Sequence, residues 1–90
     1  MTLDTVRQAI DSCGDTDTAV FARRTRNAIA MAIVARESST PPPHEPPVAQ
    51  LREVLGDDLA DHLATVYAGG EDWTTHAIDA LEPLNALARS

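Results

Sequence analysis

Residues 18–37, TAVFARRTRNAIAMAIVARE, lie within the longest stretch of this 90-residue chain that has neither glycine nor proline. At 100° per residue, Phe21 and Ile29 share one side of a helix, and Arg23 and Arg26 lie on the opposite side. Alanine favours helix over strand, so the composition also supports a helix. We therefore expect a central helix roughly 30 Å long, which is the width of a small domain.

The second half of this stretch, residues 28–35, is apolar on every side. Met31 and Val34 occupy the side that carries arginine in the first half, and a helix that is apolar all round is normally buried all round. We expect Phe21, Ile29 and their neighbours to hold the other helices of the same chain. The second side is then left for a partner.

A stripe along this second side consists of Val20, Asn27, Met31 and Val34, spaced i, i+7, i+11 and i+14. A single asparagine in an apolar stripe can fix helix register and oligomeric state. We interpret these four residues as an interface between two copies of the central helix. The alternative is that Asn27 is hydrogen-bonded within its own subunit.

Apolar residues recur at helical spacing through the rest of the chain as well. They predict one domain over residues 1–90, an all-α compact bundle of four helices, or five. The expected helices cover about residues 3–13, 17–37, 47–68 and 72–88. Within the third of these, the apolar stripe runs through Gly56 without a change of phase, which favours one continuous, bent helix. Asp57 and Asp58 are good N-terminal caps, so a break into two helices remains the alternative.

The composition changes abruptly at residues 38–47, SSTPPPHEPP. Proline at this density forbids helix and central strand, so we expect a Pro-rich linker. At about 3.1 Å per residue the linker reaches roughly 30 Å, the length of the central helix. The following helix can therefore return along its own chain or cross to another subunit.

The net charge of −7 is unevenly distributed: residues 1–47 carry six acids and five arginines, whereas residues 48–90 carry eight acids and two arginines. An acidic surface repels nucleic acids and membranes and favours a basic partner, although a merely solvated face is the simpler interpretation. The candidate acidic partner surface comprises Glu53, Asp57, Asp58, Asp61, Glu71 and Asp72.

Three arginines, Arg23, Arg24 and Arg26, raise the alternative of a helix-turn-helix-like DNA-binding regulator. The match is incomplete, because Asp15 stands where an apolar turn residue is needed and Arg24 where the second helix needs a core residue. Binding to nucleic acid is thus not favoured. We expect these arginines to pair with acidic residues of the second half of the chain or of a partner.

Histidine and carboxylate recur at helical spacing in two places, Asp58 with His62 and His76 with Asp79. If the last two helices pack antiparallel, these four side chains could approach one another and bind zinc or iron. Such spacings also arise by chance in an Asp-rich chain. We expect no metal, no cofactor and no catalytic residues.

Cys13 is the only cysteine, so it cannot form an intrachain disulfide and is expected to be a buried thiol. The N-terminal residues lack the pattern of a signal peptide, and the apolar run 28–35 is too short to cross a bilayer. These features favour a cytoplasmic protein that does not contact membranes.

Together, these patterns predict a small non-enzymatic protein–protein interaction or regulatory module that acts as a homodimer and binds an unknown protein. The alternative is an acidic inhibitor of a basic partner surface, such as an immunity protein, an antitoxin or a nucleic-acid mimic. The two differ in their expected response to salt, because only the second depends on charge.

Overall fold

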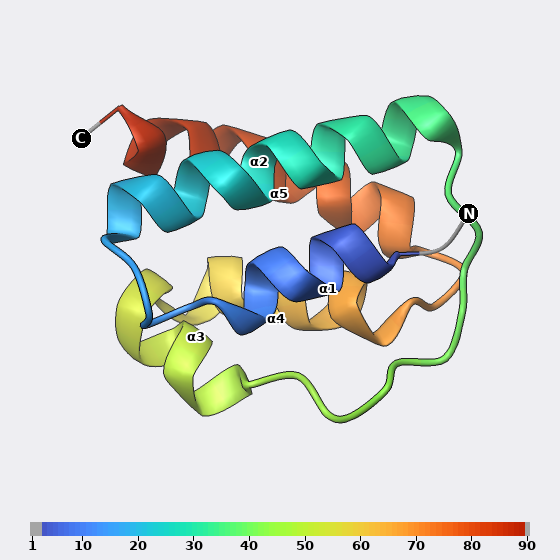
Figure 1. Ribbon diagram of the computed structural model, residues 1–90, viewed down its shortest axis with the longest axis horizontal. Coiled ribbons are helices and arrows are strands. Elements are labelled where there is room, and N and C mark those ends of the chain that lie inside the picture. The colour runs from blue at the N-terminus through green and yellow to red at the C-terminus, as the bar shows by residue number, and fades with distance from the viewer. Residues whose placement is uncertain (1–2, 90) are drawn as a thin grey trace.

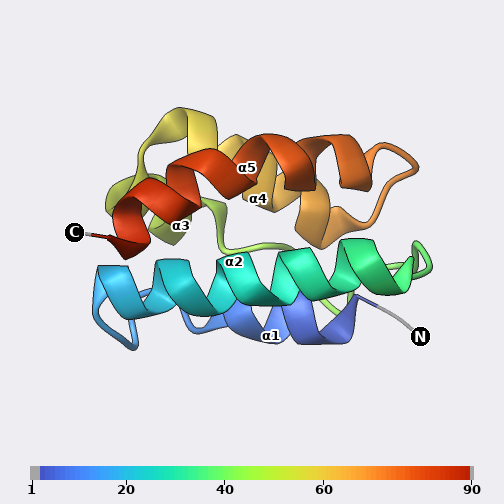
Figure 2. The ribbon, with the colours of Figure 1, turned by 90° about the horizontal axis from the view of Figure 1, so that it is seen from above.

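A computed structural model describes residues 3–89 and shows an all-α bundle of five helices within this range. The helices are α1 (Asp4–Asp11), α2 (Thr18–Ala35), α3 (Val48–Leu55), α4 (Asp57–Ala68) and α5 (Trp73–Ala88). They form two layers, with α1 and α2 in one and α3, α4 and α5 in the other (Figure 2). The predicted fold class is confirmed.

The predicted inner face of the central helix is buried between these layers. Phe21 and Ile29 of α2 are almost completely inaccessible, as is Leu84 of α5. α2 and α5 share the most extensive contact in the bundle and run in opposite directions along its length (Figure 1). Pro83 does not end α5, which continues through it to Ala88. The single thiol, Cys13, is also buried, and burial together with the nearby carboxylate of Asp15 raises its pKa.

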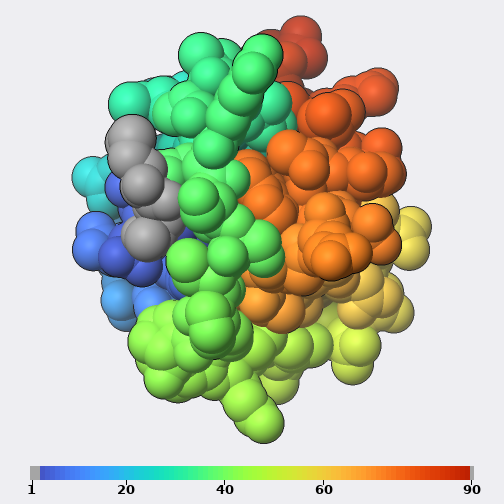
Figure 3. Space-filling view, turned by 90° about the vertical axis from the view of Figure 1, so that its right-hand side faces the viewer, coloured from blue at the N-terminus to red at the C-terminus, as the bar shows by residue number. Residues whose placement is uncertain are grey.

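The linker returns along its own chain, from the end of α2 to the opposite end of the molecule, where α3 begins (Figure 1). Figure 3 shows it lying across one end of the bundle, between α1 and the connection of α4 to α5. α2 ends at Ala35, followed by Arg36 in the left-handed conformation with φ of 56°. The amide of Glu37 then donates to the carbonyl of Ala32 at 3.0 Å, the pattern of a Schellman cap.

The preferred prediction of one continuous helix over residues 47–68 is wrong. Gly56 has φ of 89° and ψ of 169°, a conformation accessible essentially only to glycine, and it separates α3 from α4. Across this break the guanidinium of Arg52 lies 3.2 Å from the carboxylate of Asp61. In a continuous helix nine residues would separate the two along the axis by roughly 13 Å. The apolar stripe is unbroken because α3 and α4 both turn it toward the same core.

Candidate functional site

The outer side of α2 carries the predicted interface residues, and the structure leaves most of them uncovered. Met31 and Val34 expose 69% and 83% of their surface. Asn27 is exposed as well, whereas Val20 is half-buried against the bundle. This side of α2 is therefore largely uncovered within a single chain, and its burial against a partner remains a prediction.

Two shallow depressions follow this side of α2. Ala30, Met31, Val34 and Ala35 line an apolar recess of about 400 Å³. A neighbouring groove of about 420 Å³ lies between α2 and α5. It is lined by Arg26, Asn27, Ala30, Leu81, Glu82 and Asn85.

The same surface continues onto α5 through Ile78, which is 56% exposed. Ile78 precedes Leu81 and Glu82 by three and four positions, so it lies on the side of α5 that faces the groove. Met31, Val34 and Ile78 are the exposed large hydrophobic residues within the part of the chain described. All three belong to the two helices that form the groove. We call this surface, made of the recess, the groove and Ile78, the α2–α5 face.

Hydrogen bonds within the chain connect the polar residues of this face. The Arg26 guanidinium donates to Oδ1 of Asn85 at 2.7 Å and more weakly to Oδ1 of Asn27 at 3.3 Å. Asn27 is therefore hydrogen-bonded within its own subunit, as the alternative interpretation required. Its position in an exposed stripe still leaves its amide N–H₂ group available for an additional partner.

The three arginines of α2 do not form the expected intrachain ion pairs. Within residues 3–89, no ion pair involves Arg23 or Arg24, both of which are exposed, and Arg26 binds a neutral asparagine. α1 and α2 also lie side by side in opposite directions in both views, whereas the helices of a helix-turn-helix cross steeply (Figures 1 and 2). The geometry thus gives no added support to DNA binding.

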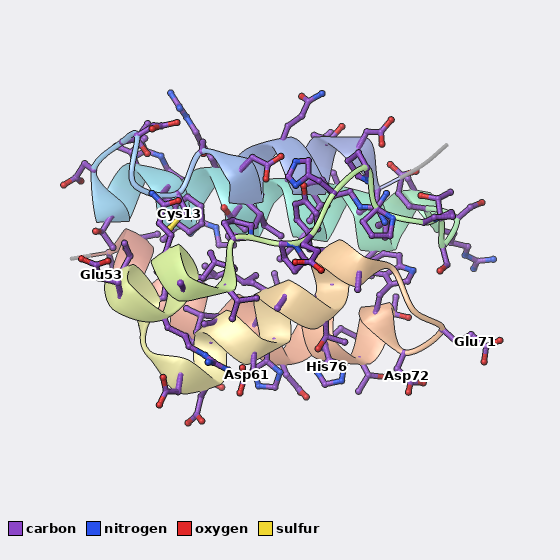
Figure 4. All side chains as sticks on the ribbon, turned by 90° about the horizontal axis from the view of Figure 1, so that it is seen from below. Cys13, Glu53, Asp61, Glu71, Asp72 and His76 are labelled. Carbon is purple, nitrogen blue, oxygen red and sulfur yellow. The ribbon has the colours of Figure 1, made fainter. Side chains whose placement is uncertain are left out.

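The six predicted acidic surface residues, Glu53, Asp57, Asp58, Asp61, Glu71 and Asp72, are all exposed. Glu53 lies at one end of the molecule and Glu71 and Asp72 at the other, with Asp61 between them (Figure 4). Asp61 is paired with Arg52. The acids therefore spread along the α3–α5 layer instead of gathering around one site.

Two of the metal candidates meet. α4 and α5 pack together in opposite directions, which brings Nδ1 of His62 to 3.1 Å from Nδ1 of His76. The ring centroids are 5.4 Å apart, and both side chains are half-buried. The carboxylates of Asp58 and Asp79 have not joined them: among residues 3–89, no three histidine, cysteine or carboxylate side chains are placed to hold a metal together.

A second polar cluster, which the sequence did not reveal, fastens the linker to α1 and α4. The hydroxyl of Tyr67 lies 3.1 Å from Oδ2 of Asp11 and 2.9 Å from Nε2 of His44. His44 Nε2 is in turn 3.4 Å from Oδ2 of Asp11. Burial, and then the hydrogen bond to Asp11, raise the pKa of Tyr67 to about 12. A phenol with so high a pKa stays protonated at neutral pH and acts as a hydrogen-bonding group.

Arg7 of α1 binds both α4 and the linker. Its side chain is almost completely buried, although it is a cation on α1. Nε donates to the carbonyl of Tyr67 at 2.8 Å, and the two terminal nitrogens donate to the hydroxyl and carbonyl of Thr40 and to the carbonyl of Pro41. Tyr67 stands in the last turn of α4, where the helix dipole favours a positive charge. We call Arg7 and the linker segment that it binds, residues 40–41, the linker clasp.

A signal for Arg7 was present in the sequence. Position 7 is i+4 from Leu3, the buried residue just before α1, and i−3 from Ile10, a buried residue of α1, so Arg7 lies on the face that packs against the bundle. A buried arginine requires acceptors, and these come from carbonyls of residues distant in sequence. Residue types alone do not identify such acceptors.

The chain matches no known family model, no curated protein and no solved structure. No helix within residues 3–89 combines the length and hydrophobicity needed to cross a bilayer.

Proposed function

We propose that this protein is a non-enzymatic interaction module that forms a homodimer through the α2–α5 face. The observation that supports the proposal best is the exposure of Met31 and Val34, 69% and 83%, on a helix whose other side is the centre of the core. Large apolar side chains that are exposed together on a small protein commonly mark a contact surface. We also propose a cytoplasmic location.

The charges on this face are compatible with pairing of two copies. α2 brings Arg26 to the groove and α5 brings Glu82. In a two-fold interface the same patch meets itself, so residues of opposite charge on the two helices can face each other across the axis. A stable dimer buries roughly 800 Å² per subunit, about one sixth of the 5098 Å² surface of this chain. The contact must therefore run along α2 and α5 and not only over the three exposed apolar side chains.

Sedimentation equilibrium over a wide concentration range tests this proposal. The wild-type chain is expected to have twice the monomer mass, and Val34→Glu is expected to shift it to monomer without loss of helical content. Ala49→Glu is the matched control, because it adds the same charge at an exposed alanine of α3, away from the face. A wild-type monomer at the highest concentration would refute the proposal, as would a Val34→Glu dimer.

The acidic inhibitor remains the second candidate, and the exposure of all six acidic surface residues favours it. It predicts an association with a basic partner that weakens steeply as salt is raised. Dimerisation through the α2–α5 face, which is mostly apolar, should respond much less. Association measured at low and at high salt therefore separates the two candidates.

A further inference from the structure

We propose that His62 and His76 form a binding site for a divalent transition-metal ion of the zinc class, on the outer side of the α4–α5 layer. Figure 4 shows His76 on the side of this layer turned away from α1 and α2, near Asp61 of the neighbouring helix. The α2–α5 face uses other residues of α5, so this site is independent of the proposed dimer.

The first support for this site is the distance between the two ring nitrogens. Nδ1 of His62 and Nδ1 of His76 are 3.1 Å apart. Two imidazole nitrogens bound to one tetrahedral zinc at 2.0–2.1 Å stand roughly 3.3 Å from each other. A small opening of this contact therefore converts a hydrogen bond between two imidazoles into a pair of metal ligands. Only a proton shared between the rings needs to leave, because metal ligation requires both nitrogens to be unprotonated.

The second support is the rigidity of the two helices that supply the rings. The residues that follow His62 and His76 on the inner side, Leu63 and Ala77, are completely buried. The backbones on which the two imidazoles stand are therefore held by the core, and the ligand geometry is prepared before any ion binds. Such preparation lowers the cost of ordering the ligands on binding.

The third support is the open pocket beside His62. This pocket, about 530 Å³, lies where α3, α4 and α5 meet, and Asp58, Asp79 and Pro83 are among its lining residues. Asp58 and Asp79 are exposed, so their carboxylates are free to turn toward the ion. Two imidazoles with carboxylate or water oxygen are a ligand set that zinc accepts.

The test is a titration of the purified chain with Zn²⁺, followed by calorimetry and by thermal unfolding, with Co²⁺ as a spectroscopic probe of coordination. One ion per chain is expected, together with a Tm that rises with metal concentration. Substituting a residue that only supports a metal ligand typically lowers metal affinity roughly 10–100-fold. His62→Asn and His76→Asn each remove a ligand itself, so each should lower the Zn²⁺ affinity by more than that. His44→Asn is the matched control, since His44 is the only other histidine and lies on the linker.

The outcomes decide the proposal. Stoichiometric binding that both His62→Asn and His76→Asn abolish and His44→Asn retains supports it, provided that circular dichroism shows both variants folded. No binding to the wild-type chain, or binding that survives loss of either histidine, overturns it. The double variant Asp58→Asn/Asp79→Asn should bind more weakly, and an unchanged affinity would remove the carboxylates from the ligand set.

Discussion

Substituting Gly69 by alanine should loosen the linker clasp. Gly69 is buried at the end of α4, with φ of 71° and ψ of 31°. A Cβ atom built there would lie 2.5 Å from the carbonyl oxygen of Thr40 and 2.6 Å from a terminal nitrogen of Arg7. Both atoms belong to the clasp and hydrogen-bond to each other, so neither can move without disturbing the other.

The magnitude follows from two effects on the free energy of unfolding. A left-handed conformation costs an alanine about 1–2 kcal/mol, of which about 0.4–1 is offset by the smaller entropy of the unfolded chain. Overpacking against Thr40 and Arg7 adds about 1–3 kcal/mol. A net loss of about 3 kcal/mol lowers Tm by roughly 12–24 °C for a domain of this size.

Two other glycines provide comparisons. Gly70 has open space around its Cβ position and no positive φ, so Gly70→Ala should change stability by less than about 0.5 kcal/mol. Gly56 also has open space, but its φ of 89° and ψ of 169° are essentially restricted to glycine, so Gly56→Ala carries a larger backbone penalty than Gly69→Ala and bounds that effect from above. Urea unfolding followed by the fluorescence of Trp73, the only tryptophan and 4% exposed, measures all three variants. A loss in Gly69→Ala no larger than about 1–2 kcal/mol, the cost of the left-handed backbone alone, would refute the close packing of the clasp over Gly69.

Four further predictions concern single residues. Arg7→Met should cost about 3 kcal/mol, because it leaves the buried carbonyls of the clasp without a donor, and limited proteolysis should then cut the linker faster. Tyr67, the only tyrosine, should ionise near pH 12 in the folded chain and near 10 in denaturant by ultraviolet titration. Because the unfolded chain holds fewer protons between these values, stability should fall as pH rises from about 10 to 12, and Tyr67→Phe should reduce that fall, leaving the part that comes from the raised pKa of the Cys13 thiol. Arg36→Gly should raise stability by about 0.5–1 kcal/mol in urea unfolding, since it relieves the left-handed residue at the end of α2. Thr25→Val should stabilise by about 1 kcal/mol, because the Thr25 hydroxyl is buried and has no hydrogen-bond partner within residues 3–89; a calorimetric Tm at or below that of the wild type would contradict this.

The parts of the fold that depend on local periodicity were predictable. The inner face of α2, with Phe21 and Ile29, followed from helical spacing because burial repeats every three or four residues. The spacing of apolar residues does not reveal the break at Gly56, since leucines four residues apart on either side fit a continuous helix as well as two helices that share a core. Only the backbone angles of Gly56 distinguish these cases, and the sequence pattern does not contain them.

The candidate sites were predictable only in part, because they join residues that are distant in sequence. The approach of His62 to His76 was expected if the last two helices packed antiparallel, and the structure supplies that packing. The linker clasp was not expected, because its acceptors are backbone carbonyls, which every residue has. Met31 and Val34 are exposed within one chain, on the side of α2 predicted to be left for a partner, and whether a second copy covers them remains a prediction for solution measurements.

The pairing of α2 with α5 has a consequence for synthesis of the chain. About 55 residues separate Ile29 from Leu84, and at 5–20 residues per second a ribosome needs roughly 3–11 s to add them. During that interval α2 has emerged without the helix that covers its inner face, and its outer face is apolar too. A nascent chain in this state exposes both sides of one helix, so the protein should be most prone to aggregation, and most dependent on chaperones, before α5 is complete.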